Sequence, residues 1–331
     1  MDKKFGFGPR LKGIDWMDLL RNYLVVFVAI VLLIVSSQLS DAFLTTQNIF
    51  NLLRQLVPPT LIAMGMLFVI MTGGINLSVG SVVAMASVFT AHLLYGGHSL
   101  FVTVLLVILS SAVFGVCLGY LVAYRRLAPF VVTLAGMTIA RGIAFIVSGG
   151  MPRRIMSPTL RSFAVDSFLG IPVLVWFAAV IVIILGLVHR HTSWGRLVQT
   201  IGSNETAAKL SGIRTNYYKV SVYVLSSVLA GIGGVIIASR VGMGSPLAGY
   251  MMELDAIAAV VIGGASLAGG NGKVLNTLMG VLVLGMIGNI MNLMNISSHP
   301  QQVLQGVIII LAILMQMNRK GGKDITSSSM A

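Results

Sequence analysis

Long apolar stretches with almost no charge recur along nearly the whole chain. A bilayer core of about 30 Å requires about 20 apolar residues per helix, and ten segments approach or exceed that length: 23–39, 57–72, 79–95, 99–124, 127–148, 170–188, 218–240, 254–270, 274–295 and 302–318. The pattern predicts an all-α, polytopic membrane protein with about ten transmembrane helices. Nine or eleven helices stay open, because the second, third and eighth segments are short and interrupted by glycine.

The composition excludes an ordinary soluble domain. Of the 331 residues, 56% are hydrophobic and only 9% are charged, whereas soluble domains carry about 25% charged residues. The single cysteine, Cys117, leaves no intramolecular disulfide and no cysteine-built metal site. No His-Glu-x-x-His pattern accompanies the five histidines. We therefore expect no metal site and no catalytic site in this chain.

The basic residues predict an orientation, because loops rich in Lys and Arg stay on the cytoplasmic side. With the N-terminus inside, 16 of the 22 basic residues lie on the cytoplasmic side and five lie outside, while Arg141 falls within a span. This bias predicts a cytoplasmic segment 1–22, a transmembrane domain 23–318 with an uncleaved first helix, and a cytoplasmic tail 319–331. It also explains the net charge of +13 without nucleic acid.

Two small-residue patterns predict close helix packing, because small side chains let backbones approach each other in lipid. Gly115 and Gly119 form a GxxxG pair, and Ala230, Gly234 and Ala238 form a stripe on a later helix.

Two glycine clusters, 73–80 and 263–270, share four identical positions at an offset of 190. They predict an internal duplication with broken helices, although a chance similarity of two glycine-rich turns remains the alternative. The second cluster leads to Lys273 but lacks the first Gly and the Ser or Thr of a phosphate-binding loop. No nucleotide site is therefore expected here.

The charged segment 189–219 predicts a short capped helix on the cytoplasmic side. Ser203 or Asn204 can cap its first amides, Glu205 suits the positive end of the helix dipole, and Gly212 suits its end. Ala207, Ala208 and Leu210 would give the helix a small apolar surface that fits a groove on a partner. A connector lying on the membrane surface is the alternative.

Three motifs in this order carry a resemblance to a known family: residues 73–81 (GGINLSVGS), 195–213 (GRLVQTIGSNETAAKLSGI) and 253–264 (ELDAIAAVVIGG). The chain resembles, from about residue 43 to 314, the membrane permease subunits of ABC importers for monosaccharides of the ribose, xylose and galactose type. These belong to a superfamily that includes branched-chain amino acid permeases. Asn76 stands where close sugar permeases are expected to have Asp, which weakens any inference about the substrate.

The resemblance implies a division of labour in a bacterial cytoplasmic membrane. Two permease copies, identical or different, would form the pore within membrane lipid, and an extracytoplasmic solute-binding protein would deliver the solute. ATP and Mg would bind to separate ATPase subunits, so this chain would hold no cofactor and would not be an enzyme. The helix in segment 189–219 would couple the permease to the ATPase, through Gly202, Asn204, Glu205, Ala207, Ala208, Leu210 and Gly212.

Polar residues within the spans are candidates for the translocation pathway or its gate. Charges are costly at this depth, so we expect Arg141 to pair with Asp255 or, less favourably, with Glu253. A fixed ion pair between two helices is the alternative role. The other candidates are amide and hydroxyl side chains that equally suit interhelical hydrogen bonds, namely Asn76, Ser78, Asn289 and Asn292.

Three other functions remain open at this point. A permease for branched-chain amino acids or nucleosides would differ in the solute held by its binding protein. An ion-coupled carrier would need no ATPase, but the scarcity of carboxylates within the spans counts against proton coupling. A structural membrane scaffold would leave uptake unaffected when it is deleted.

Overall fold

The computed structural model describes residues 16–297, 299–308, 310–311 and 314. This part of the chain is dominated by helices, as the sequence predicted. The helices are α1 (Trp16–Leu39), α2 (Thr46–Met71), α3 (Val79–Tyr95), α4 (Leu100–Ala123), α5 (Pro129–Ser148), α6 (Pro158–Val165), α7 (Val173–His191), α8 (Ser193–Ser203), α9 (Glu205–Leu210), α10 (Thr215–Val241), α11 (Met252–Ile262) and α12 (Val274–Leu293). Residues 299–308 are also helical.

Six of the described helices are long and apolar enough to cross a membrane: α2, α4, α5, α7, α10 and α12. Val25–Leu39 and Val79–Tyr95 are apolar but shorter. A multi-pass membrane protein is therefore supported, whereas the predicted count of about ten spans is not confirmed. Part of the last predicted span, 302–318, most of the predicted N-terminal segment 1–22 and the whole tail 319–331 lie outside the described residues.

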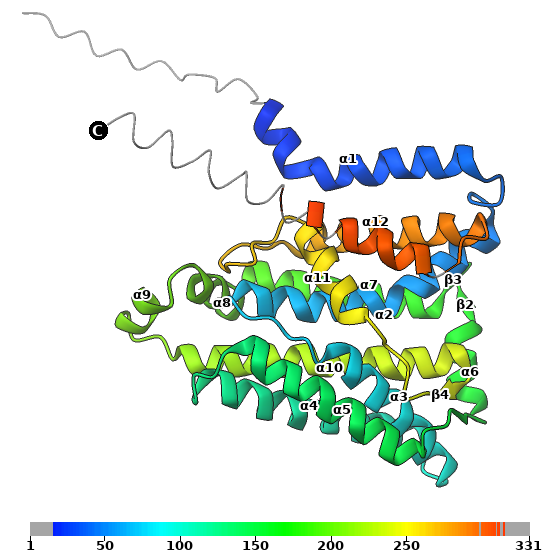
Figure 1. The fold of residues 1–331 in the computed structure, drawn as a ribbon, viewed down its shortest axis with the longest axis horizontal. Helices are drawn as coiled ribbons and strands as arrows, with labels where there is room; N and C mark the ends of the chain where they lie inside the picture. The colour runs from blue at the N-terminus through cyan, green and yellow to red at the C-terminus, as the bar shows by residue number, and fades with distance from the viewer. Residues whose placement is uncertain (1–15, 298, 309, 312–313, 315–331) are drawn as a thin grey trace, which may run out of the picture.

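The long helices run side by side between two ends of the molecule (Figure 1). At one end lie α8 and α9, and we call this the α9 end. At the other, which we call the strand end, lie α6 and four two-residue strands, β1 (Arg153–Arg154), β2 (Ser167–Phe168), β3 (Ile171–Pro172) and β4 (Met243–Gly244). Strand β1 pairs antiparallel with β4, and β2 pairs antiparallel with β3.

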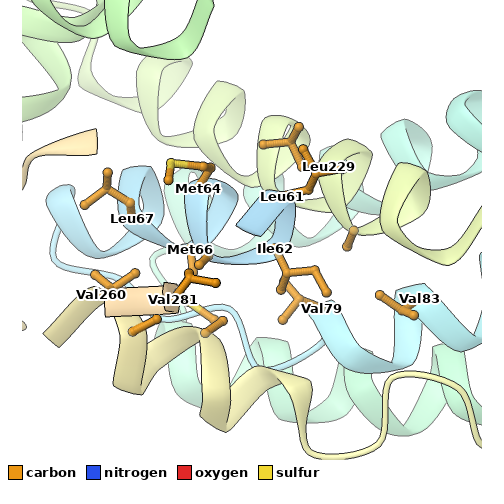
Figure 2. Close-up of a cluster of buried hydrophobic side chains, with 14 of the residues drawn as sticks. Leu61, Ile62, Met64, Met66, Leu67, Val79, Val83, Leu229, Val260 and Val281 are labelled. Carbon is orange, nitrogen blue, oxygen red and sulfur yellow. The ribbon is translucent and has the colours of Figure 1, made fainter. Parts of the chain in front are cut away.

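Helix α2 lies at the centre of the bundle. Its side chains from residue 60 to 71 are buried on every face, which is the pattern of a helix surrounded by protein. Figure 2 shows this core, with Leu61, Ile62 and Leu67 of α2 among side chains from α3, α10, α11 and α12. Pro58 and Pro59 lie inside α2, and neighbouring helices make such breaks in the backbone pattern tolerable in lipid.

The predicted glycine packing between helices is confirmed. A Cβ atom on Gly115 would lie 2.8 Å from the Cα atom of Val224, and one on Gly119 would lie 2.9 Å from that of Val220. Helix α4 can therefore approach α10 only because these positions lack side chains. In the second stripe, a Cβ atom on Gly234 would lie 2.7 Å from Ala86 of α3.

Two predicted spans have other boundaries in the structure. The predicted span 254–270 is wrong beyond Ile262, because Gly264, Gly269 and Gly270 adopt positive φ angles that end the helix. The predicted span 57–72 is too short at its start, because Thr45 accepts a hydrogen bond from the Asn48 amide and caps α2 eleven residues earlier.

Two non-helical segments, 72–78 and 242–251, each return the chain into the bundle, and they do so from opposite ends. We call them the first and the second interruption. Helix α2 ends at the α9 end, and residues 72–78 then lead back to α3, which runs to the strand end. Helix α10 ends at the strand end, and residues 242–251 then lead back to α11, which runs to the α9 end. The bundle therefore contains two helices that begin in its interior, α3 with 17 residues and α11 with 11 residues.

Candidate functional site

The predicted capped helix is present as α9. The side chain of Asn204 accepts a hydrogen bond from the Ala207 amide at 2.9 Å, which identifies Asn204 rather than Ser203 as the N-cap. Gly212 follows the helix with a φ angle of +77°, which suits glycine at this position. Local sequence signals therefore predicted both ends of the helix correctly.

Helix α9 presents an uncovered apolar surface at the tip of the molecule (Figure 1). Leu210 is 86% exposed, and Ala207 is exposed beside it at a spacing of three residues. Ala208 faces the protein and is 2% exposed. We define Ala207 and Leu210 as the α9 patch.

Two lysines hold Glu205 at the start of α9. Lys209, one turn along the same helix, lies 2.7 Å from Oε1, and Lys219 of α10 lies 2.5 Å from Oε2. Partial burial raises the pKa of Glu205, but the hydrogen bonds and charges of both lysines outweigh it and lower the pKa below its ordinary value. The Lys219 contact fixes α9 against the long helix α10.

Behind α9, Gly202 lies against the backbone next to both glycine clusters, 73–80 and 263–270. The Gly270 amide donates a hydrogen bond to the Met71 carbonyl at 3.0 Å. A Cβ atom on Gly202 would overlap that same carbonyl and lie 2.6 Å from the Gly270 nitrogen. A Cβ atom on Gly269 would lie 2.8 Å from the Gly202 carbonyl oxygen and 3.0 Å from the Gly73 nitrogen. We call these five residues, Met71, Gly73, Gly202, Gly269 and Gly270, the glycine junction.

Asn76 and Ser78 occupy the first interruption, and both are fully buried. Asn76 Oδ1 accepts hydrogen bonds from the Ser78 amide and hydroxyl, and Asn76 Nδ2 donates to Ser226 of α10 at 3.1 Å. Thr133 of α5 donates to the Ile75 carbonyl. These contacts fix the non-helical backbone within the bundle. A pathway role for Asn76 and Ser78 stays a prediction.

The first turns of α3 and α11 meet in the interior. A Cβ atom on Gly80 of α3 would overlap both the Glu253 carboxylate of α11 and the Gly249 carbonyl. Met251, just before α11, adopts a positive φ of 63°. The Glu253 carboxylate therefore lies beside the N-terminal ends of two helices, where a negative charge is favoured.

Arg141 of α5 holds the second interruption by its carbonyl groups. Its Nη1 atom donates to Pro246 O at 2.7 Å and to Ala248 O at 3.0 Å. Glu253 is close enough for its charge to act on Arg141, but among the described residues no ion pair joins Arg141 to Glu253 or to Asp255. The expected ion pair of Arg141 is therefore not observed with either carboxylate, because the guanidinium donates to the carbonyls of segment 242–251.

The two asparagines of α12 have different partners. Asn289 and Asn48 of α2 exchange two amide hydrogen bonds, at 2.9 and 3.0 Å. Asn292 is exposed and accepts a hydrogen bond from Gln301 at 2.8 Å. Asn289 is therefore buried against α2 whereas Asn292 is exposed, and the pathway role of both stays a prediction.

The strand end carries basic residues and a cleft of about 600 Å³. Tyr95, His98, Arg153 and Arg154 are among its lining residues. The Arg153 guanidinium lies 4.6 Å from the centre of the Tyr95 ring. The two arginines make this cleft suited to an acidic protein surface.

The arrangement of these residues suits a change of conformation rather than a chemical reaction. No group of three or more His, Cys, Asp and Glu side chains in the described residues is placed to hold a metal ion. Residues that sequence reasoning missed are Asn48, Ser226 and the interruption 242–251. Ser226 lies within the predicted span 218–240 and could have been found there as a polar residue, whereas Asn48 precedes the predicted span 57–72. The interruption carries no such signal beyond its glycines and Pro246.

Comparison with known proteins defines the class. The model of a family described as the permease component of branched-chain amino acid transport systems matches residues 48–313. A ribose import permease protein of Bacillus subtilis is 40% identical over 92% of this chain and 94% of its own length. The ribose import permease protein of Escherichia coli K12 is 37% identical over 88% and 92%, and an L-arabinose ABC transporter permease protein of Azospirillum brasilense is 34% identical over 94% and 91%. No solved structure matches.

The fold and these similarities define a multi-pass membrane transport subunit and not an enzyme. The chain belongs to the family of ABC importer permease components that the matching model describes.

Proposed function

We propose that this chain is the permease subunit of an ATP-driven importer for a monosaccharide. The carrying observation is the 40% identity to a ribose import permease over 92% of the chain. Relatives named for L-arabinose and D-allose import, each 34% identical, support a sugar rather than an amino acid as the solute.

The α9 patch is the proposed contact with the ATPase. A small exposed apolar surface on a capped helix fits a groove on a partner protein, and Leu210 is almost fully exposed. The tie between Glu205 and Lys219 would make α9 and α10 move together.

The glycine junction would transmit this movement into the bundle. Gly202 lies directly against Met71 and Gly270, so a shift of α8 displaces the backbone at the start of both glycine-rich segments. The first segment leads to Asn76 and α3, whose Gly80 contacts Glu253 of α11. Helices α3 and α11 would thereby move together as the permease changes between inward and outward states. The ATPase would shift the populations of these two states.

We propose that the α9 end faces the cytoplasm of a bacterial cell, with both termini on that side, because most basic residues fall there under the positive-inside rule. The strand end would then face the solute-binding protein. Arg153 and Arg154 in its cleft would attract acidic residues of that partner.

The proposed pathway passes the face formed by α5 and α11, where a second copy of the permease would complete it. Arg141, Glu253 and Asp255 lie at this face, and Tyr250 beside them is 69% exposed. Hydroxyl groups of a sugar can donate to carboxylates and accept from guanidinium groups. Asn76, Ser78, Asn289 and Asn292 would support the pathway from neighbouring positions.

Reconstitution tests the function directly. The permease, the ATPase and the binding protein encoded with it would be placed in liposomes, and uptake of labelled ribose, arabinose, allose and leucine would be compared. We expect uptake of one sugar that requires all three components and ATP. Uptake by the permease alone that follows a sodium or proton gradient would contradict the proposal, and uptake of leucine alone would correct the substrate class.

A further inference from the structure

A second cleft opens at the α9 end, between the end of α4 and the start of α10. Its volume is about 760 Å³, and it is lined by residues that include Tyr124, Lys209, Arg214, Asn216, Tyr217 and Tyr218. Gly212 of the predicted coupling segment lines it, but the α9 patch does not, because Ala207 and Leu210 are not among its lining residues.

The cleft has a positive electrostatic character. Arg214 and Lys209 contribute cationic groups, and no acidic residue lies among the described residues that line it. Part of the Lys209 charge is offset by Glu205, so Arg214 is the main cation. The first turn of the 27-residue helix α10 also lines the cleft. The amides of Thr215 and Tyr217 donate to the Ile213 and Arg214 carbonyls, and the dipole of α10 favours an anion at this end of the helix.

Aromatic residues place the cleft at the depth of lipid headgroups. Tyr217 and Tyr218 begin α10, and Tyr120 and Tyr124 end α4 with stacked rings 5.3 Å apart. Tyrosines gather at the boundary between hydrocarbon and water in membrane proteins. Arg125 and Arg126, which are exposed, directly follow Tyr124.

An apolar stripe leads from this cleft along the outer face of α4. The stripe consists of exposed side chains at helical spacings of three and four, namely Leu105, Leu109, Val113, Val116 and Tyr120. This is the surface that an acyl chain would cover, since α4 lies at the edge of the bundle (Figure 1). The stripe and the cleft are continuous through Tyr124, four residues beyond Tyr120.

We propose that this cleft binds the headgroup of an anionic phospholipid whose acyl chain lies along α4. The phosphate lies between Arg214 and the first turn of α10, and the tyrosines surround the glycerol region. Because the cleft adjoins α9 through Lys209 and Gly212, lipid bound there stabilises the position of the coupling helix. The site does not depend on which solute the permease carries.

Native mass spectrometry of the full-length protein in detergent tests this site. The protein would be titrated with dioleoyl phosphatidylglycerol, with dioleoyl phosphatidylcholine as the neutral probe and inorganic phosphate as the free anion. We expect Arg214→Gln to weaken phosphatidylglycerol binding about fivefold, in keeping with the contribution of one basic residue near a membrane surface. Arg190→Gln, the same change at an exposed position at the end of α7, is the matched control and should leave binding unchanged.

A second variant keeps the test independent of folding defects. Asn216→Glu places an acid in the first turn of α10, where it suits the helix dipole but repels an anionic headgroup. We expect this variant to be folded and to lose preferential phosphatidylglycerol binding. Equal binding of both lipids, equal binding by wild type and both cleft variants, or equal occupancy by phosphate would overturn the proposal. Loss of the lipid when the ATPase assembles would assign the cleft to the protein interface and would also overturn it.

Discussion

Lys219 of α10 and Glu205 of α9 form an ion pair at 2.5 Å, although they are separated by the turn that joins the two helices. A second lysine, Lys209, pairs with the same carboxylate from within α9. Of the two pairs, only the one with Lys219 joins the six-residue helix α9 to the bundle. The two lysines therefore allow the fixing of α9 to be separated from its local stability.

We expect Lys219→Gln to reduce coupled transport more than Lys209→Gln does. The pair with Lys219 is partly shielded, whereas the pair with Lys209 is an exposed i, i+4 contact, and exposed pairs contribute about 0.2–1 kcal/mol. Folding should thus change little in either variant. The measurement is sugar-stimulated ATP hydrolysis in the reconstituted complex, with Lys209→Gln as the matched control. Equal losses in both variants would show that the tie to α10 has no special role.

The tie should weaken in acid. The pKa of Glu205 lies below its ordinary value in the folded protein, so the folded state favours the charged carboxylate. Its contribution to stability is therefore fully present above the unfolded pKa of about 4.3 and is lost as the pH falls through the lowered folded value. Thermal unfolding in detergent, measured from pH 7 to pH 3, should show a smaller acid-induced loss in Glu205→Gln than in the wild type. An identical pH profile for both proteins would contradict this assignment.

Gly202→Ala should damage the protein at the glycine junction. The added methyl group would overlap the Met71 carbonyl and approach Gly270, and overpacking of this kind costs about 1–3 kcal/mol. Gly186→Ala in α7 is the control, since its nearest neighbour would be at 3.9 Å, an ordinary contact. We expect a lower midpoint of thermal unfolding and loss of ATP-driven uptake only for Gly202→Ala. Normal uptake by this variant would remove the junction from the coupling route.

Local signals explain what the sequence could predict. Asn204 and Gly212 define α9 through short-range capping and a positive φ angle, so neither depends on the rest of the fold. Gly115 and Gly119 predicted a close helix contact, and α10 is the partner that the structure identifies. The sequence could not choose that partner, because lipid and protein surfaces are both apolar.

The interruptions could not be predicted with the same success. Hydropathy is similar for a helix and for an extended segment at the same depth. The pattern therefore predicts one span over 254–270, although α11 ends at Ile262. The partner of Arg141 was missed for a related reason. Its hydrogen bonds go to the carbonyls of Pro246 and Ala248, and carbonyl groups carry no sequence signal.

Arg141→Met should uncouple the second interruption from α5. The variant loses two hydrogen bonds from a charged donor, and each such bond contributes about 1.5–3 kcal/mol. Because Glu253 is the charged neighbour, we expect the effects of Arg141→Met and Glu253→Gln on uptake to be less than additive. Asp255→Asn is the matched control, and its combination with Arg141→Met should be close to additive. The reverse pattern would restore Asp255 as the partner.

Asn289→Ala should act mainly on stability. Its removal takes away the two amide hydrogen bonds that join α2 to α12, and each such bond contributes about 0.5–1.5 kcal/mol. Asn289 is only 8% exposed, whereas Asn292 is exposed, so a solute can reach the second side chain more readily than the first. We therefore expect Asn289→Ala to lower the midpoint of thermal unfolding with an unchanged KM for uptake. Asn48→Ala should have the same effect, and the double variant should be no worse than either single one. A raised KM in Asn289→Ala with unchanged stability would instead place this amide in the pathway.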